Sequence, residues 1–415
     1  MSLSDFKPMQ ERCSNCSYCK WIPFDQVKSA RFAENCPSEC LYNFNTYSAR
    51  GRFQAGLAVV NEELDYDETF THVVNSCLDC GSCDVSCKIC RYNLEPLEHN
   101  RELKHDAIIK GHVSDAQKKL IENLHNDKTL MSGKNRADRT AWAEGIQWAE
   151  DAEVLYFPGC KYAYEEAYKD TVRSTAEIIL KAGVKLGYLG NADMCCAGRA
   201  YQMGFFEEFD AQADSLMKAF ELKNVKAIVT PCSDCYYSLK RLYAKKGLKL
   251  EIYHAVEYLD KLISEGKLQF TKTLDKVVTY HDPCHLGRQG EPYVAWDGHE
   301  KKILNQVHTW EPRRPRYNGA HGIYDAPRNI IKAIPGVKLV EMERIREYSW
   351  CCGAGSCMNE TNKDLSDFTA KERVTEANAT GAQTLVTACP WCRSNFENAG
   401  GIAVEDILDL VKEAL

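Results

Sequence analysis

Apolar residues in the first third of the chain recur at the three- and four-residue spacing of amphipathic helices. The clearest stretches are 45–64 and 66–75, and two weaker patterns follow between residues 101 and 126. The next segment, 127–139, has almost no apolar residues, which is typical of a linker. We therefore expect a helical first domain that ends near residue 140.

Further along, short apolar runs rich in β-branched residues alternate with helical patterns. The runs are VLYF at 154–157, AIVT at 227–230, VVTY at 277–280 and TLVT at 384–387. Strands that alternate with helices form parallel sheets, and ligands of such sheets bind beyond the carboxyl ends of the strands. Because cysteines follow each run, we expect them to gather at that edge.

The same order of features occurs twice in this region. Each pass has one cysteine after a run, then a Cys-Cys pair, then a Cys-x-x-Cys pair after another run. The second pass is longer before its Cys-Cys pair, so it carries an insertion of about 32 residues, roughly 289–322. The two cysteine sets are Cys160, Cys195, Cys196, Cys232 and Cys235, and then Cys284, Cys351, Cys352, Cys389 and Cys392.

These patterns predict an α+β protein. At 415 residues the chain is long enough for two or three domains that each bury a core. We expect an N-terminal α-helical, ferredoxin-like domain with its linker at 1–140. Two pseudo-symmetric α/β repeats with parallel sheets follow at 141–270 and 271–415.

The chain contains 21 cysteines, which a chain of this size does not need as cross-links. Disulfide frameworks belong to short secreted domains, and the start MSLSDFKPMQ lacks the basic and apolar regions of a secretory signal. We expect a reducing, cytoplasmic location and no membrane segment of its own, because no apolar stretch approaches about 18 residues. A formal net charge of -7 argues against a nucleic-acid surface, since phosphate binding needs clustered Lys and Arg.

Two cysteine runs in the helical region have the spacing of ferredoxin ligands. They are Cys13, Cys16 and Cys19, and then Cys77, Cys80, Cys83 and Cys87. In two-cluster ferredoxins the fourth cysteine of one run ligates the other cluster, so we assign Cys87 to the first set. Cys36, which precedes a proline, then completes the second set. Cys40 and Cys90 lie within a few residues of the favoured choices and stay open as alternatives.

Structural zinc also uses Cys-x-x-Cys pairs, but it takes four ligands. Triplets would leave one thiolate over in each group, and five cysteines per repeat exceed four. A cluster with several irons can use adjacent thiolates on different metals, whereas one tetrahedral ion is poorly chelated by them. Iron–sulfur clusters are therefore favoured, and the alternative is a colourless, zinc-stabilised scaffold without redox chemistry.

The second repeat contains the phrases YHDPCHLGR, YDAPRNIIKAIPGVKLVEME and CCGAG, which resemble those of CCG-domain iron–sulfur oxidoreductases. The layout of a two-cubane ferredoxin module fused to two CCG repeats is similar to that of the D-type catalytic subunit of heterodisulfide reductase. The resemblance covers nearly the whole chain. This sequence departs from the family pattern at Ala197, where the family has glycine, and in the insertion between HLGR and YDAPR.

The resemblance implies two [4Fe–4S] cubane clusters in the first domain. It also implies one or two non-cubane [4Fe–4S] clusters, each held by one five-cysteine set. In the family a substrate disulfide is cleaved at these clusters. That chemistry implies a catalytic role for the set of the second repeat, Cys284, Cys351, Cys352, Cys389 and Cys392.

No GxGxxG motif opens a βαβ unit, so electrons must come from another subunit. We expect an iron–sulfur electron-transfer subunit of a larger anaerobic redox complex, such as those around class II benzoyl-CoA reductase or membrane redox complexes. Its partners would be a flavin- or iron–sulfur-containing subunit or a membrane cytochrome subunit, with a terminal reductase as a further partner. The alternative is a reductase that cleaves a disulfide to two thiols. A partner would also place the chain at the inner membrane face.

Three further features have two interpretations each. Cys357 is either a neighbour of a cluster or a small buried side chain. His281 and His285 flank Cys284 and would either deliver protons or donate a hydrogen bond to backbone or cluster sulfur. The insertion is dense in aromatic and cationic residues, so we expect a protein interface or a lid over the second cysteine set, rather than a surface loop folded on its own aromatics.

Overall fold

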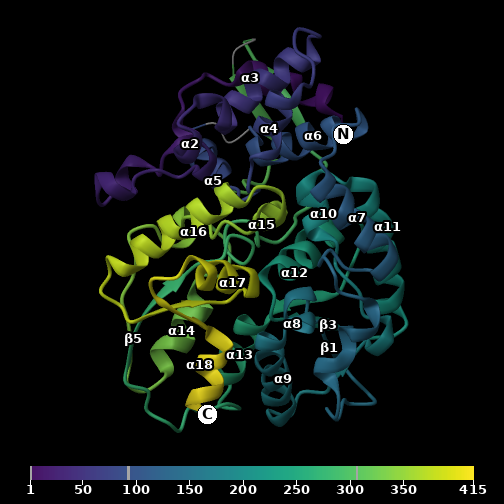
Figure 1. Cartoon of the computed structure of the whole chain (residues 1–415), viewed down its shortest axis with the longest axis vertical. Helices are drawn as coiled ribbons and strands as arrows, with labels where there is room; N and C mark the ends of the chain where they lie inside the picture. The colour runs from purple at the N-terminus through teal and green to yellow at the C-terminus, as the bar shows by residue number, and fades with distance from the viewer. Residues whose placement is uncertain (1, 91–93, 305–306) are drawn as a thin grey trace.

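The computed structural model of the chain describes residues 2–90, 94–304 and 307–415, and the side chains of Cys90 and His308 lie outside the described part. Figure 1 shows a helical domain above two α/β repeats that lie side by side. The predicted fold class, a helical domain followed by two repeats with parallel sheets, is confirmed.

The first domain is helical, as its apolar spacing predicts. Asp67 begins one helix by accepting a hydrogen bond from the backbone N–H of Phe70, and Ser114 and Gln117 form a capping box at another. Its own core gathers Leu3, Tyr66 and Leu103 with their neighbours. The helices are α1 (Lys7–Arg12), α2 (Pro37–Tyr42), α3 (Ala49–Val60), α4 (Glu68–Asn75), α5 (Ser82–Cys90), α6 (Pro96–Ile109) and α7 (Asp115–Asp127).

The first repeat is built on a four-stranded parallel sheet in the order β2-β1-β3-β4. Its two central strands, with the sequences VLY and AIVT, are buried along their whole length. The strands are β1 (Val154–Tyr156), β2 (Leu186–Tyr188), β3 (Ala227–Thr230) and β4 (Glu251–His254). The helices are α8 (Cys160–Tyr164), α9 (Glu166–Lys181), α10 (Gly198–Met203), α11 (Phe206–Glu221), α12 (Ser233–Tyr237) and α13 (Ala255–Ser264).

The second repeat has the same topology, because its sheet order, β10-β9-β5-β8, equals that of the first repeat read from the other edge. The duplication predicted from the sequence is therefore a duplication of structure. Its strands are β5 (Lys276–His281), β8 (Val337–Leu339), β9 (Thr384–Thr387) and β10 (Ala403–Asp406). Its helices are α14 (Asp325–Ala333), α15 (Met358–Thr361), α16 (Lys363–Asn378), α17 (Pro390–Ala399) and α18 (Ile407–Ala414).

The insertion of the second repeat forms an antiparallel hairpin of β6 (His299–Ile303) and β7 (Val307–Glu311). It leaves the repeat after β5 and reaches the helical domain, where it lies behind α3 in Figure 1. Arg12, at the end of α1, forms an ion pair of 3.1 Å with Glu300 of β6. The insertion thus spans from the second repeat to the first domain.

One hydrophobic core runs through both repeats, so they pack as a single unit. A smaller core joins the helical domain to the second repeat through Leu78, Cys351, Met358 and Leu365. At this junction a Cβ on Gly355 would lie 2.2 Å from the carbonyl oxygen of Leu78. Only a glycine allows the two backbones to approach this closely.

Candidate metal centres

The first ferredoxin-type group lies near the surface of the helical domain. Cys13, Cys16 and Cys19 follow α1, whereas Cys87 lies on α5, yet all four line one cavity. Burial raises the pKa of the Cys87 thiol, and the neighbouring Cys19 raises it further. Burial also raises the pKa of Cys19 to about 11. The chain thus brings together the four cysteines that the crossed assignment requires.

Cys36 begins α2 and faces the second ferredoxin-type run. Burial raises the pKa of Cys36 to about 12 against the opposing effect of Arg52, and among the thiols Cys80 adds most to the rise. Cys83 responds in the same way, since burial, Asp84 and then Cys77 raise its pKa. The geometry therefore groups Cys36 with the second run.

The two alternative ligands fare differently. The thiol of Cys40 donates a hydrogen bond of 3.1 Å to the Glu34 carboxylate, so its sulfur is already engaged. The side chain of Cys90 lies outside the described residues. Cys36 therefore remains the favoured fourth member of the second group.

Buried cations surround the second ferredoxin-type group. Lys104 donates 2.7 Å from its Nζ to the carbonyl of Cys77, and Arg288 donates 2.6 Å from its Nε to the carbonyl of Cys80. Arg52 and Arg101 are also buried beside this group. Positive charge at these positions offsets the negative charge that thiolates would bring into the interior.

In the first repeat, five cysteines gather beyond the carboxyl ends of the strands. The sulfurs of Cys196 and Cys235 are 3.6 Å apart. Gly159 precedes Cys160 with a φ of 78°, and a Cβ there would lie 3.0 Å from the sulfur of Cys235. This glycine leaves a hollow beside the thiols that any side chain would fill. Cys195 completes the group with Cys232, which caps α12.

Arg139 joins the first group from outside the repeat. Its Nη1 donates a hydrogen bond of 3.2 Å to the sulfur of Cys160, and its Nε lies 2.9 Å from Asp193. All three side chains are buried. The segment with the composition of a linker therefore contributes a charged donor to a thiol.

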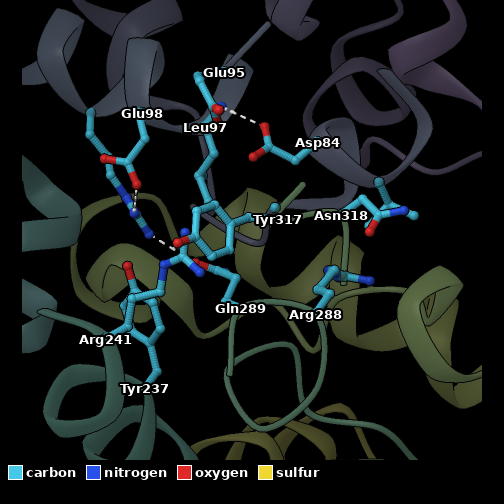
Figure 2. A pocket seen from close by; sticks show the side chains of 13 residues that line it. Asp84, Glu95, Leu97, Glu98, Tyr237, Arg241, Arg288, Gln289, Tyr317 and Asn318 are labelled. Carbon is cyan, nitrogen blue, oxygen red and sulfur yellow. Dashed lines mark hydrogen bonds and ion pairs between the residues drawn. The ribbon is translucent and has the colours of Figure 1, made fainter. Parts of the chain in front are cut away.

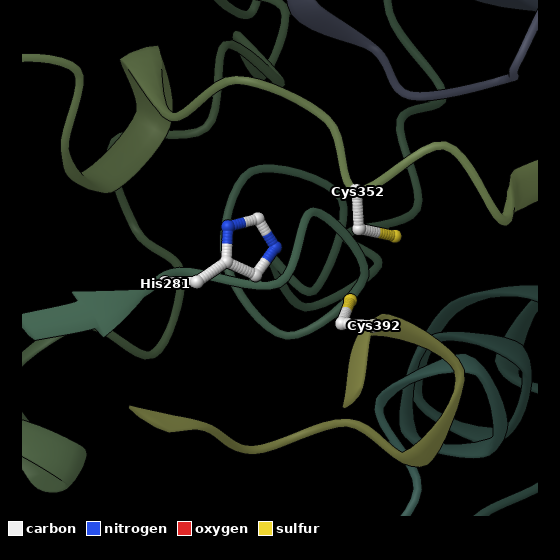
Figure 3. A group of neighbouring side chains, drawn as sticks. All are labelled: His281, Cys352 and Cys392. Carbon is white, nitrogen blue, oxygen red and sulfur yellow. The ribbon is translucent and has the colours of Figure 1, made fainter. Parts of the chain in front are cut away.

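The second repeat gathers its five cysteines in the corresponding place. Hydrogen bonds with Cys351 and Cys392 lower the pKa of the Cys352 thiol, and a further one with His281 adds to this effect. A hydrogen bond from Cys351 also lowers the pKa of Cys284. Cys389 caps α17 and completes the group. Figure 3 shows the ring of His281 turned toward the sulfurs of Cys352 and Cys392.

The two Cys-Cys pairs are followed by residues with a left-handed backbone. Ala197 has a φ of 53° and Gly353 a φ of 92°. The departure from the family pattern at Ala197 thus places a side chain where the backbone favours glycine. Gly353 has no such freedom, because a Cβ there would lie 2.4 Å from the carbonyl oxygen of Ser366.

The two groups of the repeats meet at one interface. Nδ1–H of His285, in the second repeat, donates 2.6 Å to the carboxylate of Asp234, in the first. Burial opposes the charged form of His285, but Cys284 and Asp234 outweigh it and raise the pKa of His285 to about 9. Arg199 of the first repeat donates 2.7 Å to the carbonyl of Ala354 in the second. Arg199 is therefore a buried contact between the repeats and not a surface cation.

The second ferredoxin-type group touches the second repeat directly. A hydrogen bond between the thiols of Cys80 and Cys351 lowers the pKa of Cys80. Cys357 lies in the same region, where it is buried with a left-handed φ of 56°, and burial raises its pKa to about 12. The cysteines of the helical domain and of the second repeat therefore form one continuous series.

The base of the insertion closes a small polar cavity between the helical domain and both repeats. Figure 2 shows Tyr317 of the insertion beside Arg241 of the first repeat, whose guanidinium carbon lies 3.6 Å from the ring centre. Nζ of Lys88 donates 2.9 Å to the carbonyl of Tyr317, and Arg314 forms an ion pair of 3.1 Å with Glu95. The insertion therefore binds the helical domain and is not confined to the second cysteine set.

Comparison with known proteins agrees with this arrangement. Residues 154–240 and 314–397 each match the family model of the CCG cysteine-rich domain. Over 98% of its length the chain is 29% identical to 94% of the D-type subunit of the dihydromethanophenazine:CoB–CoM heterodisulfide reductase of Methanosarcina mazei. Over 80% of its length it is 28% identical to 44% of a Bacillus subtilis protein named "Probable iron-sulfur-binding oxidoreductase FadF".

A likeness of fold alone links the chain to a solved structure. A hypothetical protein from Helicobacter pylori superposes on 87% of this chain and 67% of its own length with a TM-score of 0.53 and 10% identity. No helix in the described part of the chain has the length and apolar character needed to cross a membrane. The chain belongs to the CCG cysteine-rich domain family and, like its relatives, is an iron–sulfur redox subunit.

Proposed function

We propose that this chain is the electron-transfer subunit of a larger anaerobic redox complex and that it relays single electrons through cubane and non-cubane clusters. The observation that carries the proposal is the direct contact between the thiols of Cys80 and Cys351. It makes one path from a ferredoxin-type group to a CCG group through the interior. Iron–sulfur clusters, when bound, supply sites that accept and release one electron at a time.

The residues fit such clusters. Within the described residues no two cysteines form a disulfide, although the sulfurs of Cys196 and Cys235 are in contact. The hollow beside Gly159 and the four-cysteine cavity of the helical domain are both lined by thiols. We propose two [4Fe–4S] cubanes, held by Cys13, Cys16, Cys19 and Cys87 and by Cys36, Cys77, Cys80 and Cys83. The two five-cysteine sets would hold one non-cubane [4Fe–4S] cluster each.

The first ferredoxin-type group supports a partner at the outer end of this path. Cys16 is exposed, whereas the ten cysteines of the CCG groups are buried. Phe24, close to this group, is 78% exposed, and Leu304 at the end of β6 is 87% exposed. Exposed apolar side chains around a redox group favour a docking surface. We propose that a flavin- or iron–sulfur-containing subunit, or a membrane cytochrome subunit, docks there, and that the chain is cytoplasmic and joins a membrane only through such a partner.

The test is anaerobic purification of the native complex, followed by iron, sulfide and zinc analysis. Two cubanes require about eight irons, and the CCG groups would roughly double that number. Stoichiometric zinc with only traces of iron would instead support the zinc scaffold and refute the proposal.

The docking surface can be tested separately with matched leucines. Leu304→Asp should release the partner during purification, because a charge would enter an apolar contact. Leu222→Asp is the control, since Leu222 is 86% exposed but lies after α11 on the first repeat. Equal partner recovery with both variants would place the docking surface elsewhere.

The contacts of the insertion decide which deletion is informative. Gln289 accepts a hydrogen bond of 2.8 Å from Arg101, so removing 289–322 would also disturb the packing of the helical domain. His299 and Glu311 are paired across the hairpin, so residues 299–311 can be replaced by two glycines. This shorter deletion should keep the iron content while weakening partner binding.

A second candidate function is the cleavage of a disulfide at the CCG groups, as the name of the Methanosarcina relative indicates for that protein. The interface of the repeats supports it. Nε and Nη1 of the buried Arg199 have no hydrogen-bond partner among the described residues, and neither has Nε2 of His285. Reduction of a disulfide takes two electrons and two protons and yields two thiols. Arg199 would bind an anionic group of the substrate, and His285, held by Asp234, would carry a proton.

The two functions differ in what the isolated chain can do. With a reduced viologen dye as donor and dithiodiglycolate as a small dianionic disulfide, a reductase would form thiols without any partner. Arg199→Met should then raise KM, and Arg199→Lys should restore it in part. No thiol formation by an iron-replete chain would leave the relay function alone.

A further inference from the structure

The two CCG repeats differ in the side chain that stands next to their cysteines, and this difference can be followed position by position. His281 ends β5 three residues before Cys284, and the corresponding residue of the first repeat is Phe157, three residues before Cys160. Both side chains are buried. The sequence of one repeat is thus an internal reference for the other.

The histidine has a fixed orientation. Nε of Arg373 lies 3.1 Å from Nδ1 of His281. A guanidinium N–H can only donate, so Nδ1 must accept and carries no proton. The single ring proton is therefore on Nε2. A ring nitrogen of His281 and the sulfurs of Cys352 and Cys392 lie within 4.8 Å of one another, and Figure 3 shows that this nitrogen is Nε2.

This N–H has nowhere else to point. Nε2 is buried and has no oxygen or nitrogen partner among the residues that the structure describes. A buried donor without a partner costs about 1–3 kcal/mol, so a sulfur acceptor is needed to satisfy it.

The residue that fixes the histidine is itself fixed. Nη1 of Arg373 donates 2.7 Å to Glu376, and Nη2 donates 3.1 Å to the hydroxyl of Ser349. Arg373 and Glu376 lie on α16, and the corresponding positions on α11 of the first repeat are Leu216 and Ala219. Because the first repeat is apolar at all three places, this arrangement belongs to the second repeat alone.

The first repeat has a different donor. Arg139, from the segment before the sheet, donates to Cys160, but it is charged and paired with Asp193. The two cysteine groups therefore receive their hydrogen bonds from different residues, at different cysteines and with different charge.

We propose that His281 is a neutral, fixed-tautomer hydrogen-bond donor to the Cys352 sulfur that sets the reduction potential of the second CCG group, and that Arg373 is the positioning residue that fixes its tautomer. The proposal rests on the proposed function, since it requires a cluster in that group. A hydrogen bond to a ligand sulfur stabilises the state with more negative charge. Reduction adds one electron and one negative charge, so this bond raises the reduction potential.

The experiment is an anaerobic titration with dithionite as the one-electron donor, followed by electron paramagnetic resonance. The signal of the second group is identified by its loss in Cys389→Ser. In His281→Phe, which copies Phe157, the ratio of oxidised to reduced cluster at fixed potential should rise about tenfold, equivalent to about 59 mV for one electron. Electron–nuclear coupling to ¹⁵N-labelled histidine should disappear in the same variant.

Two further variants separate donation from packing. His281→Gln keeps an N–H near the position of Nε2 and should stay within about threefold of the unaltered protein. The double change Arg373→Leu and Glu376→Ala, which copies the first repeat, frees the tautomer and should shift the ratio in the same direction as His281→Phe. Phe157→Leu is the control and should leave the second group unchanged.

The outcomes distinguish this inference from the proposed function. An unaltered chain without iron in the CCG groups would refute the proposed function itself. An iron-replete His281→Phe with an unshifted potential would refute the role of His281 alone. An equal shift in His281→Phe and His281→Gln would show that ring packing, and not hydrogen bonding, is responsible, and would also overturn the proposal.

Discussion

Replacing Gly353 by alanine should damage the second CCG group more than any other single methyl addition near it. The backbone of Gly353 has a φ of 92°, where an L-residue costs about 1–2 kcal/mol. The new Cβ would also lie 2.4 Å from the carbonyl oxygen of Ser366 and 2.7 Å from Nδ2 of Asn395. Such overpacking typically costs about 1–3 kcal/mol. Together we expect a loss of about 2–5 kcal/mol in the free energy of unfolding.

The effect should fall on the cysteines themselves. The N–H of Gly353 donates 3.4 Å to the sulfur of Cys351, and Asn395 donates 2.7 Å to the carbonyl of Cys352. Any shift that relieves the new contacts moves this pair of thiols. We therefore expect Gly353→Ala to lose the iron of the second repeat while keeping that of the first.

The assay combines anaerobic denaturant unfolding with iron analysis. Ala197→Gly is the matched control at the corresponding position, because Ala197 already has a left-handed φ of 53°. Relief of that strain should leave stability unchanged or raise it by about 1 kcal/mol, after the entropy cost of glycine. A Gly353→Ala protein with unchanged stability and full iron content would show that the backbone at Gly353 is not a constraint.

Three further predictions concern the helical domain. Cys87→Ser should perturb the cluster held by Cys13, Cys16 and Cys19, and Cys36→Ser the one held by Cys77, Cys80 and Cys83, as seen in paramagnetic spectra; an effect on the nearest run alone would refute the crossed assignment. Gly355→Ala should loosen the contact with Leu78 by about 1–3 kcal/mol and increase hydrogen exchange around Cys77, unless the two backbones separate without cost. Arg101→Met should destabilise the chain by about 3–5 kcal/mol, because it leaves the buried carboxylate of Asp79 unpaired, and the double change with Asp79→Asn should recover most of that loss in a melting experiment.

The sequence predicted best what depends on local pattern. The runs at 227–230 and 384–387 are the strands β3 and β9, and the cysteines after them lie at one edge of each sheet, as parallel topology requires. The helices around Phe53 and Phe70 follow from apolar spacing in the same way.

The docking between domains could not be predicted, because it depends on contacts between residues far apart in the chain. Nothing around Arg199 signals that its side chain crosses to Ala354, and nothing around Cys80 signals Cys351. The segment 127–139 has the polar composition of a linker, yet its few apolar residues, Leu130 and Met131, are buried. Composition averages over residues, whereas burial is decided by each one.

The crossed grouping of the ferredoxin-type cysteines has a consequence for how the chain acquires its order. Neither group has its four cysteines in one segment, so neither is complete until residues 13–36 and 77–87 have met. A cluster in either group would act as a cross-link over a loop of several tens of residues, worth about 4 kcal/mol if it restricts the unfolded chain as a disulfide does. Because both links join the same two segments, forming one brings the cysteines of the other into reach. The helical domain should therefore load its two clusters together and lose them together.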